Sequence, residues 1–169
     1  MHGDPERTAL LAETATFVAL TAAGAWVAVP VGPVPVTLQT FFLLLAAPVM
    51  KRRAVIPAAV YVLLGAANLP VFHAGLAGLG VLLGPSGGYI AGFIPAAGVA
   101  GLAYEQNDWI LRIAGLCAGT AVIYACGVAW LLVSTGITPA AAILFGVIPF
   151  IPGDALKIAG VFLLGERIS

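Results

Sequence analysis

Charged residues are scarce in this sequence. Asp, Glu, Lys and Arg together make up 8% of its 169 residues, while 62% of the residues are hydrophobic. Soluble domains carry about a quarter charged residues. A soluble chain of this length could not bury so much apolar surface, because a large part of any small domain stays exposed. The composition therefore predicts an integral membrane protein that has the lipid bilayer as a partner.

Signatures of catalysis and of nucleic-acid binding are also missing. The chain contains no P-loop, no HExxH zinc motif and no GxSxG nucleophile motif. We therefore expect no ATP hydrolysis and no enzyme activity, so active transport would need energy from another protein. Seven basic residues balance seven acidic ones and form no basic stripe. Nucleic acid is accordingly not an expected partner.

Candidate metal ligands and disulfide partners are few. A zinc site needs about three protein ligands, and His73 has no second His or Cys nearby. We interpret His73 as an interfacial residue and expect neither a metal nor another cofactor. Cys117 and Cys126 lie nine positions apart, on opposite faces of a helix. They cannot pair within that helix and are interpreted as small buried residues.

Long stretches without any charge divide the chain. No Asp, Glu, Lys or Arg occurs in residues 14–50, 54–104 and 113–153. A spanning helix needs about 20 apolar residues, and proline clusters cannot continue a helix. The sequence predicts an all-α membrane protein, one domain over residues 1–169 with six transmembrane helices. Their expected ranges are 9–29, 37–50, 54–67, 88–104, 109–133 and 153–166.

Two Pro/Gly-rich segments should interrupt this pattern. Residues 68–87 connect the third and fourth helices, and we predict that they form a re-entrant loop with one short helix. The sequence PFIPG at 149–153 should break the chain before the last helix, with a short helix ahead of it. Irregular backbone at membrane depth is tolerated only where it is buried in protein or lines a cavity.

The basic residues indicate the orientation. With six spans, the connections near 30–36, 68–87 and 134–138 lie on one side and contain no Lys or Arg. Basic residues mark the cytoplasmic side. We therefore expect a multi-pass protein of the cell membrane with both termini in the cytoplasm. The basic residues expected on that side are Arg7, Lys51, Arg52, Arg53, Arg112 and Arg167.

A strip of small residues runs along the first helix, where Ala15, Ala19 and Ala23 lie four apart. Such strips let another helix approach closely. The neighbour is either another helix of this chain or a partner subunit.

Asp154 and Lys157 are the most informative residues. A charge within a membrane segment costs roughly 2.5–3.5 kcal/mol and is usually functional. A spacing of three places both side chains on one helix face, directly after the break at 149–153. We interpret the pair as the polar floor of a small-ligand site. The alternative is an internal ion pair that pins the last helix.

Other polar and aromatic residues should surround the same outward-facing hollow. They follow the Pro/Gly-rich connections, where the chain leaves or enters a helix. Individually, such residues are more often caps or interfacial anchors. The candidates are Thr37, Gln39, Thr40, Asn68, Phe72 and Tyr89.

Four short motifs in order resemble the signatures of a known family, BioY. They are VPVTLQT at 34–40, GAANLPVF at 65–72, GPSGGY at 84–89 and PFIPGDALK at 149–157. BioY proteins are the biotin-specific substrate-binding (S) components of energy-coupling factor (ECF) transporters. The resemblance extends over residues 10–167.

This resemblance implies a six-helix S component that binds biotin near the outer face. It also implies partners, namely a transmembrane coupling protein and two ATPase subunits. In the family, the loop before the third motif and the Asp and Lys of the fourth contact the vitamin. These positions correspond to residues 73–80, with Gly75 and Gly78, and to Asp154 and Lys157. The strip at Ala15, Ala19 and Ala23 resembles the surface that meets the coupling protein.

The chain departs from the family pattern at two positions. Leu76 lies in a loop that can carry a polar residue, and Ile90 replaces a residue that is basic in some members. Backbone N–H groups of the glycine loop are then the available donors for the biotin carboxylate.

Two alternative functions differ from biotin capture. One is an S component for another small vitamin, which would have the same fold. The other is a structural membrane subunit without a ligand, in which Asp154 and Lys157 form a purely internal pair.

Overall fold

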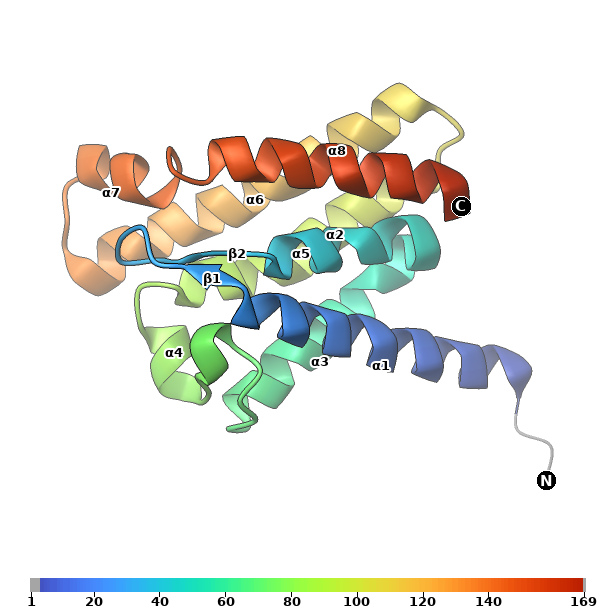
Figure 1. Cartoon of the computed structure of the whole chain (residues 1–169), viewed down its shortest axis with the longest axis horizontal. Helices are drawn as coiled ribbons and strands as arrows, with labels where there is room; N and C mark the ends of the chain where they lie inside the picture. The colour runs from blue at the N-terminus through green and yellow to red at the C-terminus, as the bar shows by residue number, and fades with distance from the viewer. Residues whose placement is uncertain (1–3, 169) are drawn as a thin grey trace.

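The computed structural model describes residues 4–168 and is mostly helical (Figure 1). The longer helices run roughly along the long axis, and most of the short elements lie toward one end of the molecule. In chain order the elements are α1 (Pro5–Trp26), β1 (Ala28–Val29), β2 (Val36–Thr37), α2 (Gln39–Met50), the 3-10 turn η1 (Lys51–Ala54), α3 (Val55–Ala66), the 3-10 turn η2 (His73–Gly75), α4 (Leu79–Leu83), α5 (Gly87–Ala103), α6 (Trp109–Thr135), α7 (Pro139–Gly146) and α8 (Ile151–Ile168).

The first helix is displaced from its predicted range of 9–29. It begins at Pro5 because the Asp4 side chain accepts a hydrogen bond from the Glu6 N–H at 3.1 Å, which is an N-cap. It ends at Trp26 because Ala28 and Val29 pair with β2 as a two-residue antiparallel ladder. This small hairpin was not predicted, since two-residue strands leave no periodic signal in the sequence.

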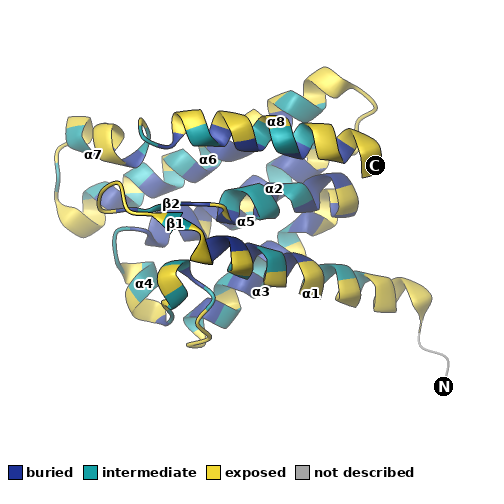
Figure 2. Cartoon of the chain, in the orientation of Figure 1, coloured by how far each residue is buried: buried dark blue, intermediate teal, exposed yellow. Residues whose placement is uncertain are grey.

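The centre of the molecule is α5, which packs along α6 and also contacts α2 and α3. Figure 2 shows the buried residues concentrated on α2 and α5, with exposed residues on the outer faces of α1, α4 and α8. Small residues allow α5 and α6 to approach closely. A Cβ added at Gly88 on α5 would lie 2.4 Å from the Cys126 carbonyl oxygen on α6, so that position has no room for a larger residue.

Two helices of the described residues, α1 and α6, are each long and apolar enough to cross a membrane. The helices α7 and α8 qualify together as a third such segment, bent by 48° at a break between them. At 17 residues, α5 is a shorter apolar helix.

The break before the last helix lies at residues 147–150 rather than at 149–153. Pro152 and Gly153 therefore belong to the first turn of α8. Proline is tolerated there because N–H groups in a first turn have no partner within the helix. The first turn of α8 also contains Asp154, whose negative charge is favourable at a helix N-terminus.

The cysteines are free, as predicted, but the prediction that both are buried is wrong. Cys117 is exposed and Cys126 is half-buried on α6. A long apolar helix in a membrane protein turns one face toward lipid, and composition alone does not show which face Cys117 occupies.

Candidate functional site

A cavity lies where the ends of several elements meet. Its wall comes from β2 and the start of α2, from η2, from the start of α5, from the middle of α6 and from the start of α8. It contains about 470 Å³ of space between atoms, including its open mouth. Four of the eight residues predicted to bind a ligand line it, namely Gln39, Tyr89, Asp154 and Lys157.

The charged pair forms one polar end of the cavity. Asp154 is 5% exposed and Lys157 is 9% exposed. The Lys157 Nζ lies 2.7 Å from Asp154 Oδ1 and donates to Thr40 Oγ1 at 2.9 Å. Tyr124 donates its hydroxyl proton to Asp154 Oδ2 at 2.5 Å. Both carboxylate oxygens therefore have a partner, as a buried charge requires.

A second polar group is built on Gln39, which is buried at the start of α2. Its side-chain oxygen accepts from the Thr37 hydroxyl at 2.9 Å, and its amide nitrogen donates to the Tyr61 hydroxyl. Tyr61 in turn donates to the Val71 carbonyl at 2.7 Å. This series of hydrogen bonds holds the Gln39 side chain in one orientation at the edge of the cavity.

Aromatic rings form the wall between these groups. The Tyr89 ring stacks on Phe150 with 6.1 Å between centroids, and Tyr124 meets Phe150 edge-on at 6.4 Å. The Tyr89 hydroxyl donates to the Gly146 carbonyl at 2.9 Å. Tyr89 therefore offers the cavity its ring, because its hydroxyl already has an acceptor on α7.

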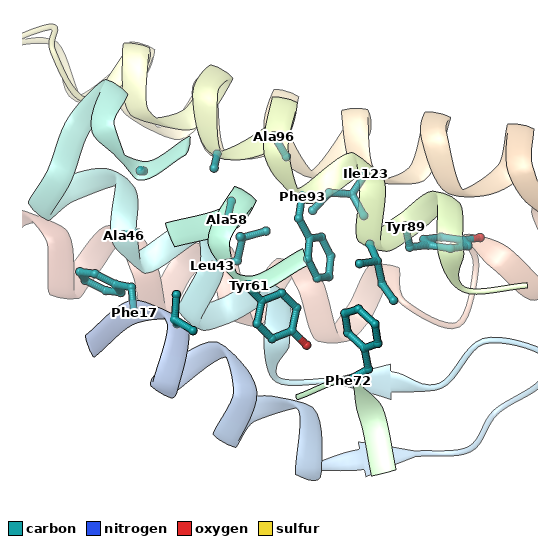
Figure 3. Packing of buried hydrophobic residues seen from close by; sticks show 14 of the residues in the cluster. Phe17, Leu43, Ala46, Ala58, Tyr61, Phe72, Tyr89, Phe93, Ala96 and Ile123 are labelled. Carbon is teal, nitrogen blue, oxygen red and sulfur yellow. The ribbon is translucent and has the colours of Figure 1, made fainter. Parts of the chain in front are cut away.

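The other four predicted ligand residues do not line the cavity. Phe72 is fully buried behind it and packs edge-on against Tyr61 at 5.7 Å (Figure 3). Asn68 is exposed, Gly75 is half-buried and Gly78 is buried. Direct contact between these residues and a ligand stays a prediction.

Phe72 instead anchors the turn that carries His73. A Cβ added at Gly65 would lie 2.1 Å from the Phe72 ring, so this glycine provides the space that the ring fills. The Phe72 N–H donates to the Leu76 carbonyl at 3.1 Å and closes the turn around η2. The anchored turn places His73 in the cavity wall.

Two polar residues of the cavity wall, Tyr124 and Ser86, were missed as ligand candidates. His73 also lines the cavity and begins the loop 73–80, which the resemblance implied as a contact of the vitamin. A phenol inside the charge-free stretch 113–153 is a signal for Tyr124, yet a tyrosine in an apolar helix is more often an interfacial anchor. Ser86 lies three residues before Tyr89 in the motif at 84–89, yet a serine at the start of a helix is more often a cap.

The small-residue strip of α1 lies on an outer surface. Ala15, Ala19 and Ala23 are all exposed, whereas Phe17, Val18, Thr21, Gly24 and Ala25 form the buried face of the same helix. Within the described residues the strip is therefore not used for internal packing.

Among residues 4–168, no group of three His, Cys, Asp or Glu side chains is arranged to hold a metal ion. The polar groups of the cavity suit a neutral or anionic organic ligand that offers both donors and acceptors.

Comparison with known proteins identifies the family. The model of the BioY family matches residues 3–169. This chain belongs to the BioY family. It is 42% identical over 163 residues to the biotin transporter BioY of Thermotoga maritima, covering 94% of this chain and 95% of that protein. It is 39% identical over 156 residues to the probable biotin transporter BioY of Pyrococcus horikoshii, covering 92% and 93%.

A solved structure has the same fold as this BioY-family chain. It is the S component for biotin from an ECF-type ABC transporter, with a TM-score of 0.88 at 23% sequence identity. The match covers 99% of this chain and 94% of that one. The apolar helices of this chain agree with the membrane location of the family's transporters.

Proposed function

We propose that this chain binds biotin in the cavity and serves as the substrate-binding component of an ECF-type transporter for biotin uptake. The observation that carries the proposal is the buried Asp154–Lys157 pair in the cavity wall. Charged side chains within a membrane segment are costly and usually mark a functional site. The chemistry of the pair also fits the head of biotin.

The ureido ring of biotin offers two N–H donors and one carbonyl acceptor. A carboxylate only accepts and an ammonium only donates. Lys157 Nζ has three N–H groups and uses two of them for Asp154 and Thr40. The third is available for the ureido carbonyl, and a free lone pair of Asp154 is available for an ureido N–H. The aromatic rings of Tyr89 and Phe150 suit the apolar body of the ligand.

We propose a single domain of six membrane spans with both termini in the cytoplasm. Support comes from the arrangement in Figure 1, where α1 begins and α8 ends toward the same end of the molecule. The β1–β2 hairpin, α4 and α7 lie toward the other end, and the connections there contain no Lys or Arg. This charge distribution supports a cavity that faces the outer side, and we propose that residues 68–87 form a re-entrant segment.

We also propose a coupling transmembrane protein and two ATPases as partners, because the chain has no P-loop of its own. The exposure of Ala15, Ala19 and Ala23 supports the strip as the surface that meets the coupling protein. A helix of that partner can approach the α1 backbone closely along these alanines.

Isothermal titration of the purified protein in detergent tests the ligand. We expect biotin to bind one-to-one, and we expect no binding of ATP or of thiamine and riboflavin at the same concentrations. Binding of another vitamin instead of biotin would keep the S-component role and replace the ligand.

A structural subunit without a ligand is the second candidate, because both oxygens of Asp154 already have partners within the chain. That function predicts no heat of binding and no thermal stabilisation by saturating biotin. A measurable heat of biotin binding, or thermal stabilisation by biotin, would rule out a subunit without a ligand.

A further inference from the structure

A hollow separate from the ligand cavity collects much of the charge of the chain. It lies where η1 joins α2 to α3, and α1 and the loop after α5 complete its wall. It contains about 640 Å³ of space between atoms, including its open mouth. We call it the basic hollow, because three cations and two carboxylates line it. These charged residues are Glu13, Lys51, Arg52, Arg53 and Glu105.

The charged residues of the basic hollow differ in their partners. The Arg52 Nε lies 3.3 Å from Glu105 Oε1, so these two form an ion pair. Among residues 4–168, neither Lys51 nor Arg53 forms an ion pair, and both are exposed. Glu13 is the remaining carboxylate of the wall. The basic hollow therefore has one positive charge in excess and two cations available for an added anion.

The backbone that carries Lys51 is fixed in a strained conformation. Its φ is 52°, in a region where glycine is normally found. A Cβ added at Gly101 on α5 would lie 2.2 Å from the Lys51 carbonyl oxygen, so η1 packs directly against α5. The Lys51 N–H donates to the Ala47 carbonyl at the end of α2. Strained residues held by their surroundings often belong to functional sites.

The surroundings of the basic hollow suit a lipid. Val49 and Met50 also line it, and two exposed leucines, Leu11 on α1 and Leu102 on α5, lie within three residues of its wall. In Figure 1, α2 ends toward the end of the molecule at which α8 also ends, the cytoplasmic end under the proposed orientation. Basic pockets on that side of membrane proteins bind anionic lipid head groups.

We infer that the basic hollow binds the phosphate group of an anionic phospholipid, with Lys51 and Arg53 as its donors. Charge-assisted hydrogen bonds from such side chains are the usual contacts of phosphate. One excess positive charge suits a phosphodiester, which carries one negative charge. The acyl chains would lie along the leucines of α1 and α5. This site goes beyond the proposed function, because it shares no wall residue with the ligand cavity.

Thermal melting in a neutral detergent tests the site. Dioleoylphosphatidylglycerol is titrated into the micelles, and dioleoylphosphatidylcholine and sodium phosphate are titrated separately. Phosphatidylglycerol should raise the melting temperature by about 3–6 °C at roughly ten times its dissociation constant. Phosphatidylcholine should give less than about half of this shift, since its ammonium group cancels the charge of its phosphate. Sodium phosphate should also give less than about half, because it has no acyl chains to bury.

Three variants locate the binding. Lys51→Gln/Arg53→Gln removes the two unpaired cations and should lower the shift caused by phosphatidylglycerol by at least about half. Arg7→Gln/Arg167→Gln is the matched control, because it removes the same charge from exposed residues outside the basic hollow. That variant should keep the shift. Glu13→Gln removes a carboxylate that repels the lipid, so it should enlarge the shift.

Several results would overturn the site. Equal losses in the two double variants would mean that the lipid responds only to net charge. Equal stabilisation by phosphatidylcholine would refute an anion site, and equal stabilisation by sodium phosphate would refute a lipid as the source of the phosphate. Without lipid, both double variants should melt with the wild type, because all four side chains are exposed. Biotin takes no part in these measurements, so a failure of the proposed function leaves their outcome unchanged.

Discussion

Separating the Asp154–Lys157 pair should show whether it stabilises the fold, binds the ligand or does both. The two side chains are 5% and 9% exposed, and their charged atoms lie 2.7 Å apart. Asp154→Asn leaves the ammonium of Lys157 buried with only neutral acceptors, and Lys157→Met leaves the carboxylate without its cation. Removing one partner of a buried pair costs about 3–5 kcal/mol. At about 2–4 °C per kcal/mol for a chain of this size, each single variant should melt roughly 6–20 °C lower.

The double variant is the decisive measurement. With both charges removed, no buried charge is left unpaired, so the melting temperature should recover most of the loss. Thermal melting in detergent measures all three variants. As a control, Glu105→Gln breaks the ion pair with Arg52, whose side chain is 75% exposed. That change should cost less than about 1 kcal/mol.

Binding is measured on the same variants. If the pair contacts the ureido ring, all three should bind biotin at least about tenfold more weakly, equivalent to about 1.4 kcal/mol. A double variant that recovers its stability and also binds biotin normally would leave the pair a purely structural role. Single variants with the same melting temperature as the wild type would refute the reasoning that each charge stabilises the other.

Three further substitutions address other contacts. Tyr124→Phe removes the hydroxyl that donates to Asp154 Oδ2 and should lower the free energy of unfolding by about 1–3 kcal/mol in denaturant titrations; an unchanged value would mean that the bond is not needed. Gly65→Ala places a methyl group 2.1 Å from the Phe72 ring and should cost about 1–3 kcal/mol through overpacking, measured by thermal melting. An unchanged melting temperature would show that the ring moves freely. Ala19→Leu changes an exposed residue, so melting and biotin binding should stay normal while co-purification with the coupling protein falls; normal co-purification would mean that the strip only faces lipid.

Much of the architecture was predictable because charge and proline mark boundaries directly. The α2 and α3 helices begin and end within two residues of the predicted ranges 37–50 and 54–67. The bend of 48° before α8 lies close to the predicted break, although Pro152 and Gly153 belong to the first turn of α8. The placement of Asp154 and Lys157 on one face needed only their spacing of three and the helical period. These features are local, so the chain encodes them without reference to distant residues.

The cavity wall depended on the tertiary structure. Periodicity assigns a residue to a helix face but does not say which other element meets that face. Tyr124 contacts Asp154 across 30 positions, and Thr40 contacts Lys157 across 117. Phe72 was predicted to contact the ligand, yet its ring fills the space left by Gly65 and lies behind the cavity wall.

The sequence by itself therefore determined the membrane environment of the chain, the position of most helices and the placement of the charged pair on one helix face. Charge, proline and glycine act within a few residues, and their effects are visible locally. Only the tertiary structure decided that Ser86, His73 and Tyr124 join that pair around one cavity and that the alanine strip of α1 faces outward. Those outcomes depend on how whole helix surfaces pack against one another, which follows from the combined shape of many side chains.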